Sequence, residues 1–246
     1  MKNERIDLLN PVREIKQTLF SRILEIIRNP KTIPRKIKRR LLGQRTLDWD
    51  ANAAELGAYC VIDGKHPPSD YEYVTKRTKE ILYPLFRKQL NGNEQTLLDF
   101  GCGPGRFTGD LAEMINGSAI GVDVTKKLIE IATPYPRVNF LFSENIFEEP
   151  LITSFDAVFV CFVLGGIDSR ELSKIAKKLV EVLENDGLLF IIESTGQTPV
   201  KDSWRIFTTS EIVELFPGID LEAVRVFHDA NQERTVFCGR KLFEAA

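Results

Sequence analysis

From Thr96 onward the chain alternates short apolar runs with stretches of helical periodicity. Apolar runs of strand length occur at Thr96–Phe100, Ala119–Asp123, Val138–Phe142, Ala157–Val160 and Leu188–Glu193. Helical patterns lie between them, near Arg106–Met114, Lys126–Ala132 and Arg170–Leu183. Short strands separated by helices are typical of crossover units, so this order predicts a parallel sheet with helices on both faces.

After Glu193 the pattern changes. A helix is expected from Ser210 to Phe216, capped by Thr209 or Ser210, and two strand-like runs follow at Leu221–Phe227 and Thr235–Gly239. The polar residues 228–233 separate these runs, which predicts an antiparallel hairpin. The expected fold class is therefore α/β, with an open, mostly parallel sheet and a C-terminal antiparallel hairpin.

Three regions precede or form this fold. Residues 1–45 are expected to be a basic helical arm, because Ile15, Leu19, Ile23 and Ile26 recur at near-helical spacing. Residues 46–90 are expected to form a helical cap or lid that leads into the core, with a helix near Tyr71–Leu90. Residues 91–246 are the expected core.

Composition narrows the class of protein. The chain has 246 residues, of which 43% are hydrophobic, so a disordered chain is excluded, and no apolar run reaches the ~18 residues that a membrane-spanning helix needs. Four scattered cysteines, without a C-x-x-C pair, and two histidines argue against a zinc site and a disulfide framework. We therefore expect no metal, and a cytoplasmic protein.

The net charge of -2 conceals an uneven distribution. Residues 1–45 hold 13 Lys/Arg and 4 Asp/Glu, a net charge of +9, whereas the remainder carries -11. Residues 28–40 contain seven basic residues and no acidic one. The hypothesis for residues 28–45 is contact with RNA or an anionic membrane, which would place the protein at the membrane periphery. A solvated terminus is the alternative.

A glycine-rich loop follows the first predicted strand. In LLDFGCGPGRFT, Gly101, Gly103 and Gly105 come between an apolar strand and a helix, where a chain must turn sharply and approach a ligand closely. Dinucleotide-binding proteins use G-x-G-x-x-G at this place, but the sixth position here is Arg106. Asp99 is also unusual at the strand end of a dinucleotide-binding fold, so these two departures argue against NAD.

Acidic residues follow the next two strands. Asp123 ends the second strand, where a carboxylate can accept both hydroxyls of a ribose; the alternative is a cap for the helix near Lys126. Glu144 and Asn145 follow the third strand, where a side chain can accept hydrogens from the amine of an adenine. A surface acidic residue is the alternative for that position.

Together these segments resemble the class I S-adenosylmethionine-dependent methyltransferases. DFGCGPG resembles the glycine-rich signature of that family, GVDV its ribose-binding strand end, and SENIFEEPLITSFDAVFV its adenine-contact loop with the fourth strand. The resemblance spans about Tyr71 to Lys241. It implies S-adenosylmethionine as cofactor and places around it Gly101, Cys102, Gly103, Asp123, Val124, Glu144, Asn145 and Cys161. Gly105 of the same loop and Phe162 after the fourth strand complete the candidate cofactor-binding residues.

The chemistry that the resemblance implies is an in-line displacement at the methyl carbon of the sulfonium. A general base is needed only for a hydroxyl acceptor. Glu193, at the end of the fifth strand, and His66, in a turn-rich segment, are the catalytic candidates, and His228 at the start of the terminal turn is a third. A surface or hydrogen-bonded structural role is the alternative for each histidine. Arg77 could pair with the carboxylate of the methionine moiety. Phe162, Tyr71 or Tyr73 could favour the sulfonium by cation–π attraction, although core packing is the alternative for each.

The sequence defines the methyl acceptor less well than it defines the cofactor. Gly165 and Gly166 stand where many small-molecule methyltransferases have a histidine pair, and they could leave room for a bulky acceptor such as a sugar, or form a structural turn. Trp49, Tyr59, Trp204 and Arg205 lie in segments expected to build the acceptor pocket. The leading hypothesis is O-methylation of a small molecule or glycosyl group. The alternatives are an RNA, lipid or cell-surface glycan acceptor reached through the basic arm, a non-catalytic cofactor-binding scaffold and, more distantly, a nicotinamide-dependent oxidoreductase.

Overall fold

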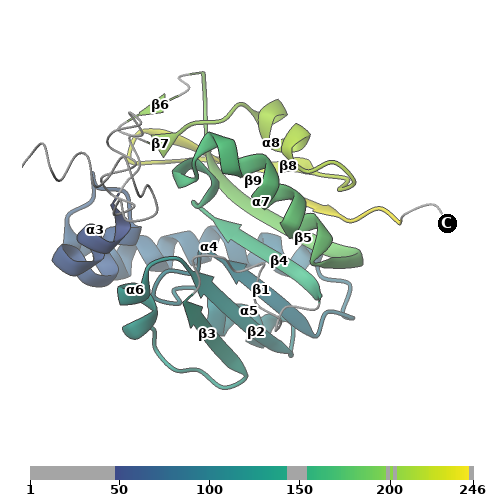
Figure 1. The fold of residues 1–246 in the computed structure, drawn as a ribbon, viewed down its shortest axis with the longest axis horizontal. Coiled ribbons are helices and arrows are strands. Elements are labelled where there is room, and N and C mark those ends of the chain that lie inside the picture. The colour runs from purple at the N-terminus through teal and green to yellow at the C-terminus, as the bar shows by residue number, and fades with distance from the viewer. Residues whose placement is uncertain (1–47, 143–153, 198–199, 202–203, 244–246) are drawn as a thin grey trace, which may run out of the picture. The chain divides into compact units, whose positions relative to one another are not determined.

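The computed structural model describes residues 48–142, 154–197, 200–201 and 204–243. The described residues lie in one compact unit, Thr46–Ala246. Its centre is a seven-stranded sheet in the order β3-β2-β1-β4-β5-β9-β8 (Figure 1). The strands are β1 (Thr96–Phe100), β2 (Ser118–Asp123), β3 (Val138–Phe142), β4 (Phe155–Cys161), β5 (Leu183–Thr195), β8 (Glu222–Asp229) and β9 (Gln232–Arg240).

The direction of the strands follows the predicted pattern. Strands β1 to β5 pair in parallel, whereas β9 pairs antiparallel with both β5 and β8. The expected α/β fold with a C-terminal antiparallel hairpin is therefore confirmed. A second small sheet pairs β6 (Val200–Lys201) with β7 (Trp204–Arg205).

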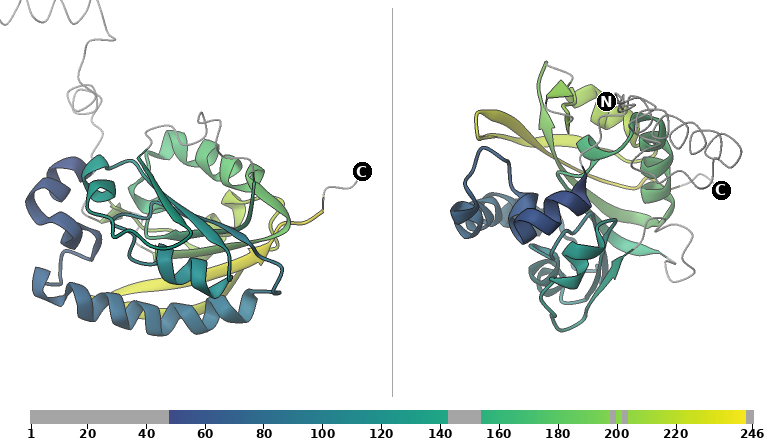
Figure 2. Two further views of the ribbon diagram at one scale, coloured as in Figure 1. Left: turned by 90° about the horizontal axis from the view of Figure 1, so that it is seen from below. Right: turned by 60° about the vertical axis from the view of Figure 1, so that its left-hand side comes forward.

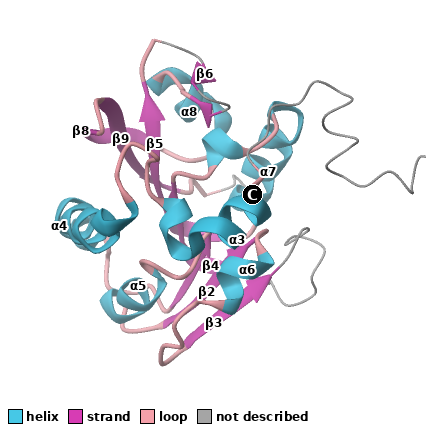
Figure 3. Ribbon diagram, turned by 90° about the vertical axis from the view of Figure 1, so that its left-hand side faces the viewer, coloured by secondary structure: helices cyan, strands magenta, loops and turns pink. Residues whose placement is uncertain are grey.

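Helices cover both faces of the sheet (Figure 3). On one face, α4 (Tyr71–Gln89) and α5 (Thr108–Met114) place Leu82, Phe86 and Leu111 in a core with Phe159 and Phe190 of the strands. On the other face, α7 (Ser169–Glu181) and α8 (Thr209–Leu215) pack against alternate strand residues such as Leu189 and Ile191. Because neighbouring residues of β5 enter opposite cores, the central strands read as continuous apolar runs.

The segment before α4 lies beside the carboxyl ends of the first strands. It comprises α3 (Trp49–Leu56), the 3-10 turns η2 (Gly57–Val61) and η3 (Pro68–Asp70), and the loop between them. Both α3 and η2 contact α6 (Lys126–Glu130), the helix that follows β2. Figure 2 shows these elements at the end of the sheet from which α4 departs.

Three local predictions need correction. The turn between β8 and β9 consists of Ala230 and Asn231 alone, both with positive φ, because the polar residues on either side continue the strands. Helix α7 ends at Glu181, and Leu183 already belongs to β5. The cap of α8 is Thr208 and not Thr209 or Ser210: its hydroxyl accepts the Glu211 N–H while the Glu211 carboxylate accepts the Thr208 N–H.

Some predictions fall outside the described residues. These are the basic helical arm of residues 1–45 and the candidates Glu144 and Asn145. No helix in the described part of the chain is long and apolar enough to cross a bilayer.

Candidate cofactor-binding and active site

The glycine loop bends sharply after β1 and folds back on β2. The backbone N–H groups of Gly101 and Cys102 both donate to the Val122 carbonyl, at 2.8 and 3.1 Å. Gly101, Gly103 and Gly105 have φ values of +73°, +56° and +80°, which residues with a Cβ rarely adopt. The loop therefore needs glycine at these three positions, as the sequence predicts.

Close neighbours reinforce this requirement. A Cβ at Gly101 would collide with the side chain of Val163, and one at Gly105 would lie 2.5 Å from Cζ of Phe140. A Cβ at Gly103 would lie 3.1 Å from Cγ1 of Val61, in η2. The outer side of the loop thus lies under the segment that precedes α4.

Asp123 joins the end of β2 to this loop. Its Oδ2 accepts the Gly103 N–H at 2.9 Å and its Oδ1 accepts the Thr125 N–H at 2.7 Å. Burial raises the pKa of the Asp123 carboxyl, while these two hydrogen bonds act in the opposite direction. The Thr125 hydroxyl also hydrogen-bonds to this carboxylate. A carboxylate has about four acceptor sites, so the group retains acceptor capacity for a ribose hydroxyl. The N-cap of α6 is Thr125 and no side chain caps this helix, so the helix-cap alternative for Asp123 is wrong and its bond to Thr125 belongs to the turn before the helix.

Asp99 lies beneath the loop. It is 2% exposed, and its Oδ2 accepts the Thr108 hydroxyl at 2.6 Å, which joins β1 to the start of α5. Burial raises the pKa of Asp99 to about 7, and the bond from Thr108 opposes that rise. A carboxyl at the end of an otherwise apolar strand was the signal for this residue in the sequence.

The other two cofactor candidates on these segments differ in exposure. Cys102 is buried between the glycines, and burial raises the pKa of its thiol well above the usual value. A thiol with a raised pKa is a poor nucleophile, which favours the interpretation of Cys102 as a small packed residue. Val124 is 55% exposed, immediately after Asp123.

The end of β4 supplies Cys161 and Phe162. Burial raises the pKa of the Cys161 thiol to about 12. Phe162 has a φ of +55°, and its N–H donates to the Ile192 carbonyl of β5 at 2.9 Å. The Arg234 guanidinium lies 4.9 Å from the centre of the Phe162 ring.

Glu193 is fully buried at the end of β5. Its Oε1 accepts the N–H groups of Val163 and Leu164, at 2.8 and 2.6 Å, and its Oε2 accepts the Ser194 N–H at 3.2 Å. Burial raises the pKa of Glu193 to about 7, and these backbone bonds oppose the rise. The carboxylate therefore holds the turn after β4, η5 (Leu164–Gly166), against the end of β5.

The interpretation of Gly165 and Gly166 as open space for an acceptor needs correction. The indole of Trp204, in β7, lies against both glycines: a Cβ at Gly165 would collide with it, and one at Gly166 would lie 3.0 Å from its Cζ3. Trp49 of α3 meets Trp204 edge to face, with ring centres 6.2 Å apart. The two glycines thus admit a tryptophan of the chain itself.

The remaining candidates lie on or before α4. His66 Nε2 lies 3.0 Å from Oδ1 of Asp229, at the end of β8. Arg77 is exposed and donates to the hydroxyl of Tyr73, one turn earlier on the same helix, at 3.2 Å. His66 is therefore tied to the carboxyl edge of the sheet, whereas Arg77 has its hydrogen bond on its own helix and feels the charge of Asp229 as well.

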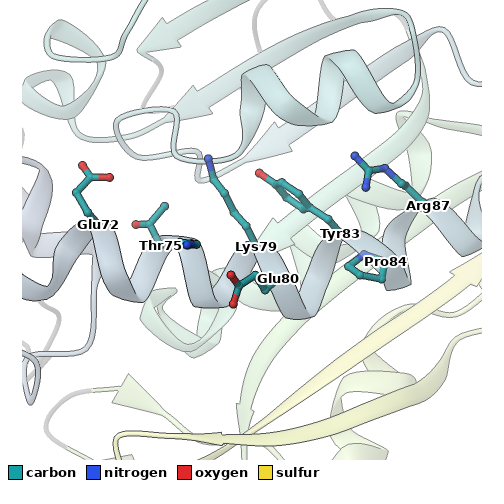
Figure 4. Close-up of a pocket in the computed structure, with 8 residues that line it drawn as sticks. Glu72, Thr75, Lys79, Glu80, Tyr83, Pro84 and Arg87 are labelled. Atoms are coloured by element: carbon teal, nitrogen blue, oxygen red, sulfur yellow. The ribbon is translucent and has the colours of Figure 1, made fainter.

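A groove of about 590 Å³ follows α4 but is separate from these residues (Figure 4). Lys79 and Tyr83, which lie together in the view, both contact Asp110 of α5. The groove is lined by Glu72, Thr75, Lys76, Lys79, Glu80, Tyr83, Pro84 and Arg87. None of them belongs to the glycine loop or to a strand end. Among the described residues, no group of His, Cys, Asp and Glu side chains could hold a metal ion.

Comparison with known proteins identifies this arrangement. The sequence pattern of the family described as "Methyltransferase domain" matches residues 97–187, from β1 into β5. Residues 97–187 therefore match a methyltransferase domain, and the chain shares its fold with S-adenosylmethionine-dependent methyltransferases. The predicted family resemblance is confirmed.

Curated methyltransferases are similar to part of this chain. Phosphoethanolamine N-methyltransferase 1 of Zea mays is 29% identical over 117 residues, which cover 44% of this chain and 23% of the relative. Malonyl-[acyl-carrier protein] O-methyltransferase of Legionella pneumophila is 32% identical over 127 residues, covering 49% of this chain and 44% of the relative. The chain thus spans less than half the length of either relative.

Solved structures share the fold over most of this chain. Magnesium protoporphyrin IX methyltransferase from Synechocystis, with bound SAH, has a TM-score of 0.61 at 13% identity and covers 78% of this chain and 96% of its own. A SAM-dependent methyltransferase from Aquifex aeolicus has a TM-score of 0.54 at 18% identity, with 72% and 100% covered.

The residues at the methyltransferase site fit S-adenosylmethionine, the cofactor of this class. The Asp123 carboxylate retains acceptor capacity for a ribose, and Gly101–Gly105 present backbone without side chains. Both lie at the carboxyl edge of a parallel sheet, where open α/β proteins bind ligands.

Sequence reasoning missed Arg234, Asp63 and the Trp49–Trp204 contact. Arg234 could have been found from the alternation of residues 234, 236 and 238, which places an arginine on an inward-facing, otherwise apolar side of β9. Trp49 begins α3, Trp204 lies in the two-residue strand β7 and Asp63 follows η2. Nothing in their spacing indicates which partner each one contacts.

Proposed function

We propose that this chain transfers the methyl group of S-adenosylmethionine to an oxygen atom of a small molecule or glycosyl group. The observation that carries the proposal is the hydrogen bond from Gly103 to Asp123, because it brings the ribose-binding carboxylate and the glycine loop together. The bound sulfonium would supply a methyl carbon open to direct attack. The work of the protein is then to align the acceptor and exclude water.

The cofactor would lie along the carboxyl edge of the sheet. Asp123 would accept the ribose hydroxyls, the backbone of Gly101–Gly105 would lie against the methionine portion, and Phe162 would border the sulfonium. Glu144 and Asn145 would contact the adenine, and Arg77 would have to turn from Tyr73 to reach the methionine carboxylate.

His66 is the better supported of the two base candidates. Its Nε2 faces the Asp229 carboxylate at 3.0 Å, an arrangement that fixes the ring and leaves Nδ1 as the atom able to take a proton from a hydroxyl. Glu193 would have to give up hydrogen bonds to two or more backbone N–H groups before it could act. We therefore assign His66 as general base and Glu193 as the alternative.

A methyl-transfer assay with several classes of acceptor tests this proposal. The purified protein is incubated with S-adenosylmethionine labelled in its methyl group and a panel of hydroxylated small molecules and glycosides, with amines and carboxylates as matched panels. Labelled product from the hydroxyl panel is expected. Product only from amines would contradict transfer to oxygen, and absence of product from every panel would contradict the proposed acceptor class.

The basic arm supports a second candidate, an acceptor carried by RNA, lipid or a cell-surface glycan. Seven basic residues without an acidic one in residues 28–40 would attract a phosphate-bearing partner, and that attraction would weaken as salt is added. Titration of RNA and of anionic vesicles into the full chain and into a chain lacking residues 1–45 tests this. Unchanged binding after the deletion would remove the arm from the contact.

A further inference from the structure

The loop that precedes α4 covers the glycine loop. We call residues 57–66, which comprise η2 and the following turn, the lid loop. A Cβ on Gly103 would lie 3.1 Å from Cγ1 of Val61 in this loop. The pKa of the neighbouring Cys60 thiol is raised to about 11, mainly by burial and secondly by the negative charge of Asp123. A ligand that lies against Gly103 must therefore displace the lid loop or enter beneath it.

Three polar contacts connect the lid loop to the hairpin β8–β9. The Asp63 carboxylate pairs with Arg234 at 2.6 Å, His66 meets Asp229 at 3.0 Å, and the Lys65 ammonium donates to the Ala230 carbonyl. Asp63 also accepts the Lys65 N–H at 3.0 Å, which fixes the turn that presents its other oxygen to Arg234. The lid loop is thus attached to the sheet at its far end, away from α3.

Arg234 is the buried member of these contacts. It is 7% exposed, stands opposite Ser194 in the β5–β9 register and donates to the Ser194 hydroxyl. Its guanidinium also lies over the Phe162 ring. One side chain therefore links the end of β4, the end of β5 and the lid loop, which are three walls of the proposed site.

Breaking the Asp63–Arg234 pair is energetically costly. A buried guanidinium without a carboxylate is costly, and the Nε–H of Arg234 already has no hydrogen-bond partner among the described residues. Opening the lid loop would remove the Asp63 carboxylate as well. The loop therefore stays closed unless the lost contacts are replaced.

We propose that Arg234 is a positioning residue that holds the lid loop closed over the glycine loop, so that the cofactor exchanges only when the Asp63–Arg234 pair opens. This inference rests on the proposed function for the identity of the ligand, but not for the closure itself. The same contacts hold His66 at the edge of the sheet, so closure and the placement of the base are linked.

The first test is hydrogen–deuterium exchange on the full chain without ligand. Asp63→Asn and Arg234→Gln are compared with Arg240→Gln, a matched control because Arg240 lies on the same strand and pairs with Glu94 at 2.7 Å. Exchange of residues 57–66 is expected to rise about tenfold in the first two variants and to stay unchanged in the control. Equal exchange in Asp63→Asn and wild type would overturn the proposal.

The second test measures dissociation of S-adenosylhomocysteine, the demethylated cofactor, by stopped-flow displacement. Asp63→Asn is expected to release it about tenfold faster, with Arg234→Lys between wild type and Arg234→Gln because lysine keeps the charge but not the planar geometry. The double variant Asp63→Asn/Arg234→Gln should release S-adenosylhomocysteine no faster than Arg234→Gln alone. Unchanged release rates would overturn the proposal, whereas no binding to wild type would instead contradict the proposed function.

Discussion

The backbone N–H of Gly103 donates to the carboxylate of Asp123, twenty residues later in the chain, at 2.9 Å. This single bond joins the two parts of the sequence on which the cofactor site depends. Parallel pairing of β1 with β2 brings them together, because it places Phe100 beside Val122 and so aligns the two strand ends. The bond therefore holds the glycine loop and the acidic end of β2 together in one proposed site.

Replacement of Asp99 by asparagine should flatten the dependence of stability on pH. The folded-state pKa of Asp99 is raised to about 7 from 3.8, so the native state binds the extra proton between these values. The contribution of Asp99 to the free energy of unfolding is therefore largest at and below pH 4 and is lost as pH rises to 7, by on the order of 3 kcal/mol. Chemical denaturation of wild type and Asp99→Asn at intervals of pH measures the difference.

The Asp99→Asn variant should retain part of the dependence of stability on pH, because of Glu193. Glu193 has a pKa raised to about 7 and contributes in the same direction. The double variant Asp99→Asn/Glu193→Gln should therefore be flatter than either single variant. A difference in the free energy of unfolding between wild type and the double variant that stays constant between pH 4 and 7 would contradict the assignment of both carboxyls.

Some parts of this structure could be predicted from the sequence, and others could not. The strands and most helices were predictable because apolar periodicity reports burial, and the glycine loop was predictable because its positive φ values require glycine. The contacts of Trp204 with Gly165 and of Arg234 with Asp63 were not. They join segments far apart in the chain, and neither residue carries a local signal that names its partner.

Glu193 should behave as a structural residue. Glu193→Ala removes the acceptor of the Val163, Leu164 and Ser194 N–H groups, and we expect the free energy of unfolding to fall by about 3–5 kcal/mol. Glu193→Gln keeps one acceptor oxygen and should cost less than half as much. Denaturant titration measures both, with the exposed Glu222→Gln as control. Loss of methyl transfer in a stable Glu193→Gln variant would instead support the alternative role as base.

Enlargement of Gly165 should disturb the turn after β4. Gly165→Ala places a methyl group against the Trp204 indole and should lower the melting temperature by several degrees, since overpacking costs about 1–3 kcal/mol. Trp204→Leu in the same chain should recover part of the loss by making room. Differential scanning calorimetry measures the three variants. Additive losses in the double variant would show that the two residues do not interact.

Substitution of His66 should slow methyl transfer. With a hydroxyl acceptor, His66→Gln should lower kcat by about 10²–10⁴-fold. Asp229→Asn should lower kcat less, because it changes only the partner of Nε2. Steady-state kinetics measures both variants, and an unchanged kcat in His66→Gln would assign the proton transfer to another group.

Calorimetric titration of S-adenosylhomocysteine into wild type and Asp123→Ala tests the cofactor site most directly. Wild type should bind it, and Asp123→Ala should bind it roughly 10- to 100-fold more weakly, the loss expected when hydrogen bonds to a charged group disappear. Circular dichroism should show both proteins folded. Absence of binding to wild type, or equal affinity in the two proteins, would contradict a cofactor held by Asp123 and the glycine loop.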